Sequence, residues 1–363
     1  MIGSRGIPAR AGGVERVVEE LTRELTARGH EVLVYGRRHY LAGSPPPDCG
    51  RVIVTPGLGA ASLDTITHTA TAMADVLFRG ADVVHVHSPG PAAWTWLASA
   101  AGLPVVLTVH AADWRREKWS PLARGVILAG LHLGMRLAAE VTAVSPGLAE
   151  ELSGRFGRVV HCIPNAVRPP QPQAPRLIER WGLSPDGYLL YVGRIVPEKR
   201  LSDLLEAHAQ AQTPVPLVVV GDADESAYSR ACRRGAGRNV CFVGPQYGQA
   251  LAELYANAAA LVHPSVLEGM SLVLLEAAAC SRCIIAADIP ANRETLGDGA
   301  LYYRGGGVDE LSRLICRILK EEGLREKLGR TARERSRTGP TWSEVAARME
   351  SVYRRAMRGR REE

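Results

Sequence analysis

The chain has 363 residues, of which 46% are hydrophobic and 23% are charged, a composition typical of a folded protein with room for two domains of about 150 to 200 residues each. Its apolar stretches are interrupted by glycine, proline and polar residues before about 18 positions, and no charged segment followed by an apolar one opens it. We therefore expect neither a transmembrane helix nor a secretory signal. The formal net charge of +6 comes from scattered arginines without interleaved aromatic residues, which argues against a nucleic-acid partner.

The cysteines indicate a reducing compartment. There are seven, an odd count without the spacing of a disulfide framework, as is typical of free thiols in the cytoplasm. Cys280 and Cys283 form a C-x-x-C pair, but no second pair or neighbouring histidine completes a zinc site. We favour ordinary packing of this pair over metal or redox use.

The N-terminal half predicts a parallel sheet covered by helices. A glycine-containing loop leads into a helix with apolar residues at helical spacing from Val14 to Leu25, and Gly29 stands where a C-cap belongs. The strand expected before this loop is nearly absent, so the chain either starts earlier in nature or opens on a stub of a strand. Apolar, β-branched runs then alternate with helical patterns, as in buried parallel strands. These runs are 31–35, 51–55, 83–87, 105–109, 140–144 and 159–163.

A proline-rich segment divides the chain, and the same alternation restarts after it. Segment 164–176 is the divide. The later strand-like runs are 188–192, 216–220, 240–244, 259–263 and 283–287. We predict an α/β protein of two doubly wound, Rossmann-like domains that face a deep cleft, with ligands at the carboxyl ends of the strands. The expected limits are an N-terminal domain 1–165, a linker 166–185, a C-terminal domain 186–340, and a C-terminal helix with a basic tail 341–363 that crosses back to the N-terminal domain.

Two motifs place phosphate-binding groups at these strand ends. In GSRGIPARAGGVE (3–15), Gly12 and Gly13 lead into a helix whose free amides could face a phosphate. It is not G-x-G-x-x-G, and by itself an ordinary strand-to-helix turn is the better interpretation. In YVGRIVPEKR (191–200), Gly193 and Arg194 end a strand and Lys199 follows. The two cations could bind a diphosphate, or they could simply be solvated, and the motif by itself favours neither interpretation.

A third motif carries a histidine. In TVHAADW (108–114), His110 ends a strand and Asp113 follows one turn later. A lone histidine is more often structural than functional, but a strand end facing a cleft favours a functional role.

A fourth motif carries two glutamates in an apolar run. HPS (263–265) precedes VLEGMSLVLLEAAA (266–279), in which Glu268 precedes a predicted helix and Glu276 lies two turns inside it. A buried carboxylate costs several kcal/mol unless it is paired, so Glu276 lies at a helix edge or awaits a partner. Eight helical residues span up to about 12 Å, so the two carboxylates could bind separate parts of a polyhydroxylated ligand but not one metal ion. We expect no metal site.

Together these motifs resemble the family 4 retaining glycosyltransferases of the GT-B fold. The resemblance covers nearly the whole chain and rests on their order: G-G-V-E, T-V-H, IPNAV (163–167), VGR-x4-K, H-P-S-x2-E-G, E-x7-E and a terminal TWSEVAARMESVY (341–353). The stretches SRGIPARAGGVE and HAADWRREKW are most similar to bacterial members that build cell-surface polysaccharides or modify secondary metabolites. Ala166 departs from the family, which often has glycine there.

The resemblance implies a role for each site residue. Glu268, His110, Arg194 and Lys199 would be catalytic. Arg194 and Lys199 would bind the donor diphosphate, and Glu276 would accept hydrogen bonds from the ribose. Glu268 and His110 would lie at the transferred sugar, and Asp113 would contact the acceptor. The remaining donor-binding positions would be Gly12, Gly13, Gly193, Gly269, Met270, Ser271 and Leu272.

The implied activity is transfer of a sugar from a UDP- or GDP-sugar to an acceptor hydroxyl with retention of configuration, without a cofactor. The partners would be the nucleotide sugar and a small-molecule, glycan or lipid-linked acceptor. Alternatives with the same architecture are a nucleotide-sugar 2-epimerase and a non-catalytic nucleotide-sugar-binding subunit. The basic clusters at 115–119 and 354–363 are either solvated faces or contacts to acidic lipid or a phosphorylated substrate, so we expect a cytoplasmic protein or one peripheral to the inner membrane face.

Overall fold

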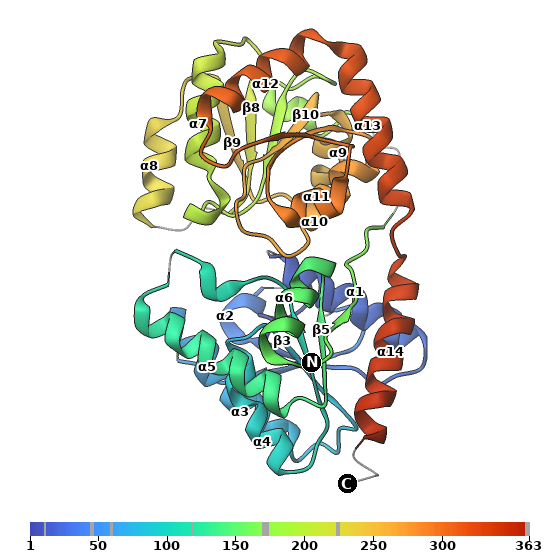
Figure 1. Cartoon of the computed structure of the whole chain (residues 1–363). Helices are drawn as coiled ribbons and strands as arrows, with labels where there is room; N and C mark the ends of the chain where they lie inside the picture. The colour runs from blue at the N-terminus through green and yellow to red at the C-terminus, as the bar shows by residue number, and fades with distance from the viewer. Residues whose placement is uncertain are drawn as a thin grey trace. The chain divides into compact units, whose positions relative to one another are not determined.

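The computed structural model describes residues 1–10, 12–43, 47–58, 61–117, 119–168, 174–222 and 226–359. The chain forms two compact units (Figure 1). Unit 1 comprises Met1–Asn165 and Pro340–Glu363, and unit 2 comprises Ala166–Gly339. Each unit is an α/β structure in which every strand pairing is parallel.

The sheet of unit 1 is built from two sets of parallel strands. One set is β1 (Leu33–Arg37) paired with β2 (Arg51–Thr55). The other has the order β3-β4-β5-β6, and its strands are β3 (Val84–His87), β4 (Val105–Val109), β5 (Glu140–Ala143) and β6 (His161–Cys162). β3 and β4 are buried along their whole length, as expected for strands covered on both faces.

The first two residues lie between these two sets. The amide of Ile2 donates to the His85 carbonyl at 2.9 Å, and the amide of His87 donates to the Ile2 carbonyl at 2.8 Å. On the other side, the amide of Tyr35 donates to the Met1 carbonyl at 3.0 Å. A stub of strand therefore stands before the glycine loop and links β1 to β3.

Helices cover this sheet, and the last of them comes from the far end of the chain. They are α1 (Gly13–Ala27), α2 (Arg38–Leu41), α3 (Ala61–Val76), η1 (Pro91–Trp94), α4 (Thr95–Ala100), η2 (Asp113–Arg115), α5 (Pro121–Leu137), α6 (Pro146–Phe156) and α14 (Trp342–Arg358). α14 packs against α1, β4 and β5. It begins with a capping box, in which Thr341 and Glu344 satisfy each other's backbone amides. The expected return of the C-terminal helix to the N-terminal domain is confirmed.

Unit 2 has a six-stranded sheet of order β12-β11-β10-β7-β8-β9. The strands are β7 (Leu189–Val192), β8 (Leu217–Val220), β9 (Val240–Gly244), β10 (Ala260–His263), β11 (Cys283–Ala287) and β12 (Leu301–Tyr303). The chain runs outward from β7 through β8 to β9, returns to the centre at β10, and runs outward the other way. The point between β7 and β10 is a topological switch point, where open α/β sheets bind ligands.

Alternate residues of each strand in unit 2 pack against helices on opposite faces. Leu189 and Tyr191 of β7 belong to a core with α7 (Leu201–Ala211) and α12 (Val308–Lys320). Tyr188 and Leu190 belong to a second core with α9 (Gly248–Asn257), α10 (Leu272–Ala279) and α11 (Pro290–Leu296). The other helices are η3 (Ile178–Trp181), η4 (Pro197–Lys199), α8 (Ala227–Gly235) and α13 (Glu322–Arg337). The predicted doubly wound α/β fold is confirmed.

Candidate functional site

The switch point of unit 2 places the first cationic motif at the end of β7. Gly193 follows the strand, and its amide donates to the Val220 carbonyl of β8 at 2.9 Å. A side chain on Gly221 would collide with the Gly193 carbonyl, so the close approach of these two loops requires glycine at 221. Arg194 comes next, with its carbonyl accepting from the Tyr191 hydroxyl at 3.0 Å. The backbone that carries Arg194 is thus held by its neighbours in the sheet.

The second cation, Lys199, contacts one of the two predicted glutamates. It closes η4 and forms an ion pair with Glu268, which lies in the loop after β10. The Nε2 atom of His263, the last residue of β10, lies 3.0 Å from the same Glu268 oxygen. The side chains of Lys199, Glu268 and His263 are 16%, 12% and 2% exposed. The structure therefore brings the two motifs together in one largely buried cluster, which spacing in the sequence could not show.

This cluster keeps Glu268 ionised. Burial raises the pKa of Glu268, but Lys199 and the hydrogen bond from His263 outweigh burial and hold that pKa well below its usual value. Burial lowers the pKa of His263, and Glu268 only partly opposes this effect. His263 is thus neutral at pH 7 and donates its Nε2 proton to the carboxylate. The HPS motif does not by itself assign His263 this role, although a histidine that ends a central strand five residues before Glu268 is a signal for it.

α10 begins shortly after Glu268 in the sequence. Ser271 is the N-cap and Leu272 the first helical residue, while Gly269 and Met270 lie in the loop before them. The Ser271 side chain makes no capping hydrogen bond, so the first amides of the helix are not satisfied by a side-chain cap. Such a helix end favours a negatively charged ligand.

Glu276 lies in the second turn of α10 and is partly exposed. Burial raises the pKa of Tyr255 well above its ordinary value, and the charge of Glu276 beside it adds to this rise. Within the described ranges, no three His, Cys, Asp or Glu side chains are grouped so that they could hold a metal ion.

In unit 1 an ion pair joins the glycine loop, through Arg5, to Glu15 in the first turn of α1. Glu15, in the first turn, accepts from the backbone amide of Arg5 at 3.1 Å and from its Nε at 3.0 Å. Gly12 is the N-cap with a φ of 96°, and a Cβ there would meet both the Glu15 carboxylate and the Arg5 guanidinium. Gly13 is the first helical residue. Steric contacts within unit 1 therefore require glycine at position 12, in addition to the role in ligand binding that the resemblance implies.

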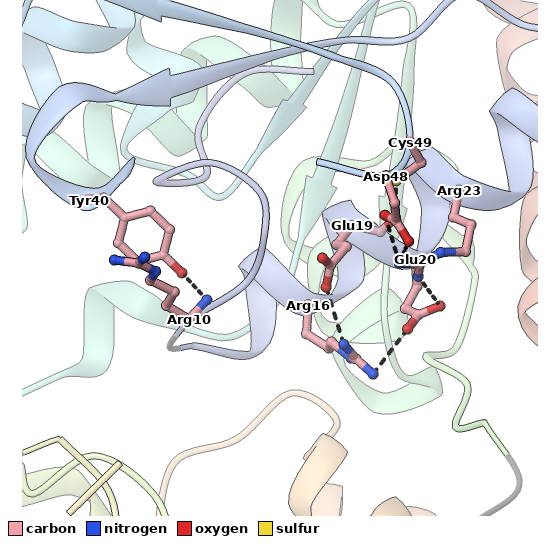
Figure 2. A network of polar contacts seen from close by, with 8 residues as sticks. All are labelled: Arg10, Arg16, Glu19, Glu20, Arg23, Tyr40, Asp48 and Cys49. Atoms are coloured by element: carbon pink, nitrogen blue, oxygen red, sulfur yellow. Dashed lines mark hydrogen bonds and ion pairs between the residues drawn. The ribbon is translucent and has the colours of Figure 1, made fainter. Parts of the chain in front are cut away.

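A polar network that includes two buried glutamates links α1 to the rest of unit 1 (Figure 2). Arg16 pairs with Glu19 and Glu20 at 3.1 Å each, and Arg23 joins Glu20 to Asp48, also at 3.1 Å. These contacts tie the helix to the loop before β2. At the other end of the view, the backbone amide of Arg10 donates to the Tyr40 hydroxyl at 2.6 Å, which holds the glycine loop against α2.

The predicted histidine of unit 1 lies in a group of three. His110 directly follows β4, and its Nε2 is 3.0 Å from Nδ1 of His87, the last residue of β3. Burial lowers the pKa of His110 to about 4 and that of His87 well below its ordinary value. The third ring, His85, has its Nδ1 2.7 Å from the Tyr353 hydroxyl of α14 and its Nε2 2.6 Å from Thr108. His85 thereby connects β3 to both α14 and β4.

Asp113 and several arginines of the basic clusters form ion pairs within unit 1. Asp113 pairs with Arg116 at 2.7 Å, and Arg115 pairs with Glu151 at 2.7 Å. Near the C-terminus, Arg354 and Arg355 lie 3.8 and 3.4 Å from carboxylate oxygens of Glu350 and Glu140, respectively. Lys118, Arg360 and Arg361 lie outside the described residues. In the part of the chain that the structure describes, no helix is long and apolar enough to span a bilayer.

In comparisons with known proteins, both halves of the chain match glycosyltransferase families. Residues 11–170 match the family described as Glycosyltransferase Family 4, and residues 175–335 match that described as Glycosyl transferases group 1. The D-inositol 3-phosphate glycosyltransferase of Xylanimonas cellulosilytica is 30% identical, over 96% of this chain and 93% of its own. The alpha-maltose-1-phosphate synthase of Mycobacterium tuberculosis is 25% identical, over 90% and 93%.

Solved structures share the fold at lower identity. Sucrose-phosphate synthase from Thermosynechococcus elongatus superposes with a TM-score of 0.80 at 21% identity, over 99% of this chain and 98% of that one. Anabaena HepE, solved in complex with UDP and glucose, superposes with a TM-score of 0.79 at 18% identity, over 95% and 97%.

Proposed function

Because this chain belongs to the family 4 glycosyltransferases, we propose that it transfers a sugar from a UDP- or GDP-sugar to an acceptor hydroxyl and retains the anomeric configuration. The observation that carries the proposal is the cluster at the switch point of unit 2. There, Lys199 and an ionised Glu268 form a largely buried ion pair in the segments that follow the central strands. A cation for a diphosphate and a carboxylate for sugar hydroxyls are thus adjacent. HepE, of similar fold, was solved with UDP and glucose, which supports a nucleotide-sugar donor.

The chemical work in this reaction is stabilisation of the leaving group. The bond between the anomeric carbon and the donor phosphate breaks, and the bond to the acceptor oxygen forms on the same face of the sugar. Negative charge grows on the departing diphosphate, where Arg194, Lys199 and the N-terminus of α10 supply positive charge. The acceptor proton passes to an oxygen of the leaving phosphate, so the reaction needs no separate protein base. These fixed charges can take the place of a divalent ion, and we propose that the enzyme uses none.

The other predicted residues orient the two substrates in this proposal. Glu268 accepts hydrogen bonds from hydroxyls of the transferred sugar, and Glu276 accepts them from the ribose. His110 contacts the sugar, while Asp113 contacts the acceptor. The glycines at 12, 13, 193 and 269, with the backbone of residues 270–272, allow close approach of the donor.

The expected acceptors are small molecules, glycans or lipid-linked sugars, in the synthesis of cell-surface glycans or secondary metabolites. We further propose peripheral contact with anionic lipid. Its support is the basic character of segments 115–119 and 354–363, although several of their arginines are already paired with carboxylates.

The test is donor turnover by matched variants. Purified protein is incubated with UDP-glucose, UDP-N-acetylglucosamine, GDP-mannose and related donors, and release of UDP or GDP is measured with and without candidate acceptors. Arg194→Ala and Lys199→Ala are each expected to lower turnover about a hundredfold or more. Lys327→Ala, which removes an exposed lysine from α13 of the same unit, is expected to leave turnover unchanged.

Three results would contradict the proposal or part of it. Full turnover in either site variant would remove that residue from the mechanism. Release of a free epimerised sugar without any acceptor would identify an epimerase instead, and binding of donors without even slow hydrolysis would identify a non-catalytic subunit.

A further inference from the structure

Two histidines on neighbouring strands form a hydrogen-bonded pair in which only one ring is accessible. His87 is 1% exposed, whereas His110 is partly exposed at the end of β4. Their nitrogens are 3.0 Å apart, and the rings stack with centroids 5.3 Å apart and planes 24° from parallel. His110 thus keeps some contact with solvent, while His87, at the end of the neighbouring strand, has almost none.

The surroundings of His87 determine which nitrogen of each ring carries the proton. A neutral imidazole has one N–H donor and one acceptor nitrogen, and burial keeps both rings neutral at pH 7. Nε2 of His87 is buried and finds no hydrogen-bond partner among the described residues. A proton there would create a buried, unpaired N–H group, which proteins rarely tolerate. The proton therefore belongs on Nδ1 of His87, where it is donated to Nε2 of His110.

This arrangement leaves His110 with its own proton on Nδ1. We propose that His87 is a positioning residue that holds His110 as the Nδ1–H tautomer, so that His110 offers a hydrogen-bond donor to a hydroxyl oxygen of the transferred sugar. The part concerning the sugar rests on the proposed function, whereas the tautomer follows from unit 1 alone. His85 has no such role, because Tyr353 and Thr108 occupy both of its nitrogens.

The tautomer is tested first, in protein without any donor. Long-range proton–nitrogen NMR correlations of ¹⁵N-histidine-labelled protein distinguish a protonated Nδ1 from a protonated Nε2. We expect Nδ1–H on both His87 and His110. A spectrum with Nε2–H on His110 would overturn the inference whatever the enzyme's substrate.

Two substitutions at position 87 then test its effect on turnover. His87→Asn places an amide nitrogen close to the position of Nδ1, so it keeps a donor to His110, whereas His87→Leu is of similar size and has none. We expect the asparagine variant to keep the Nδ1–H tautomer and a kcat/KM within about threefold of wild type. The leucine variant should lose the single tautomer and about tenfold in kcat/KM, the equivalent of one neutral hydrogen bond.

A control variant separates positioning from general damage to the fold. Tyr353→Phe removes the hydroxyl that bonds His85, whose ring centroid lies 4.0 Å from that of His87, but it leaves both atoms of the His87–His110 hydrogen bond in place. It should therefore leave kcat/KM and the His110 spectrum unchanged. Equal losses in the asparagine, leucine and phenylalanine variants would mean that His87 only supports the fold. Should His87→Leu fail to fold, the wild-type and asparagine spectra still decide the tautomer. If the tautomer is as expected but no nucleotide sugar binds, the sugar part is wrong and the proposed function fails with it.

Discussion

Removing the charge of Lys199 should destabilise unit 2 even without ligand. Lys199→Met keeps most of the side chain's length but leaves Glu268, which is 12% exposed, without its cation. Breaking a buried ion pair costs about 3 to 5 kcal/mol. His263 still donates a hydrogen bond to the carboxylate, and both partners keep some contact with solvent, so we expect a loss near the lower limit, about 3 kcal/mol at pH 7.

The destabilisation caused by Lys199→Met should decrease as the pH falls. In the wild type the folded pKa of Glu268 is depressed, so its contribution to stability is complete above the unfolded pKa of about 4.3 and is lost as pH falls through the folded value. In Lys199→Met, burial is no longer opposed by the lysine, and the folded pKa of Glu268 rises. The folded variant then takes up a proton before the unfolded chain does, and its stability increases relative to wild type between pH 7 and about 4.5.

Hydrogen exchange of peptides from β7, β8 and α10 measures the free energy of opening of unit 2 by itself. The comparison includes Glu268→Gln, the double variant and Lys327→Met as an exposed control. The double variant should be less destabilised than the sum of the single ones by about 2 kcal/mol, since contacting residues couple at this level. A loss below about 0.5 kcal/mol, the same at pH 7 and pH 5, would refute the assignment of a buried charge cluster.

Four further predictions concern metal, the configuration of the product, membrane and the C-terminal helix. Turnover should survive EDTA, and an α-linked donor should give an α-linked product by its anomeric proton coupling in NMR; loss of activity restored by manganese, or a β product, would contradict this. The protein should sediment with anionic vesicles at low salt and be released at high salt, because such attraction is screened; absence of binding at low salt would rule out the membrane contact. Tyr353→Phe should destabilise unit 1 by about 1 to 3 kcal/mol, because it leaves a buried nitrogen of His85 without its partner. Unchanged exchange in β3 and α14 would show that this hydrogen bond contributes nothing.

The sequence by itself determined the fold class, because the signals for it are local. Continuous apolar runs of strand length, separated by helical spacing, mark buried parallel strands wherever they occur. The proline-rich segment marked a break between two such series. The ends of the strands were determined only within about two residues: the run 31–35 became β1 at Leu33–Arg37, and the run 159–163 became β6 at His161–Cys162. The ordered motifs also sufficed to identify the family.

The tertiary structure alone decided which of these residues contact one another. Lys199 and Glu268 are 69 positions apart and meet because β7 and β10, far apart in the chain, are neighbours in the sheet. His87 and His110 are 23 positions apart and meet because β3 pairs with β4 in a register that aligns their carboxyl ends. Tyr353 reaches His85 because the last helix returns to the first unit. Periodicity and motif spacing report only on near neighbours along the chain, whereas strand order and register bring such distant side chains together. The charge of Glu268 and the tautomer of His110 depend on these distant partners, and so they could be inferred only from the folded molecule.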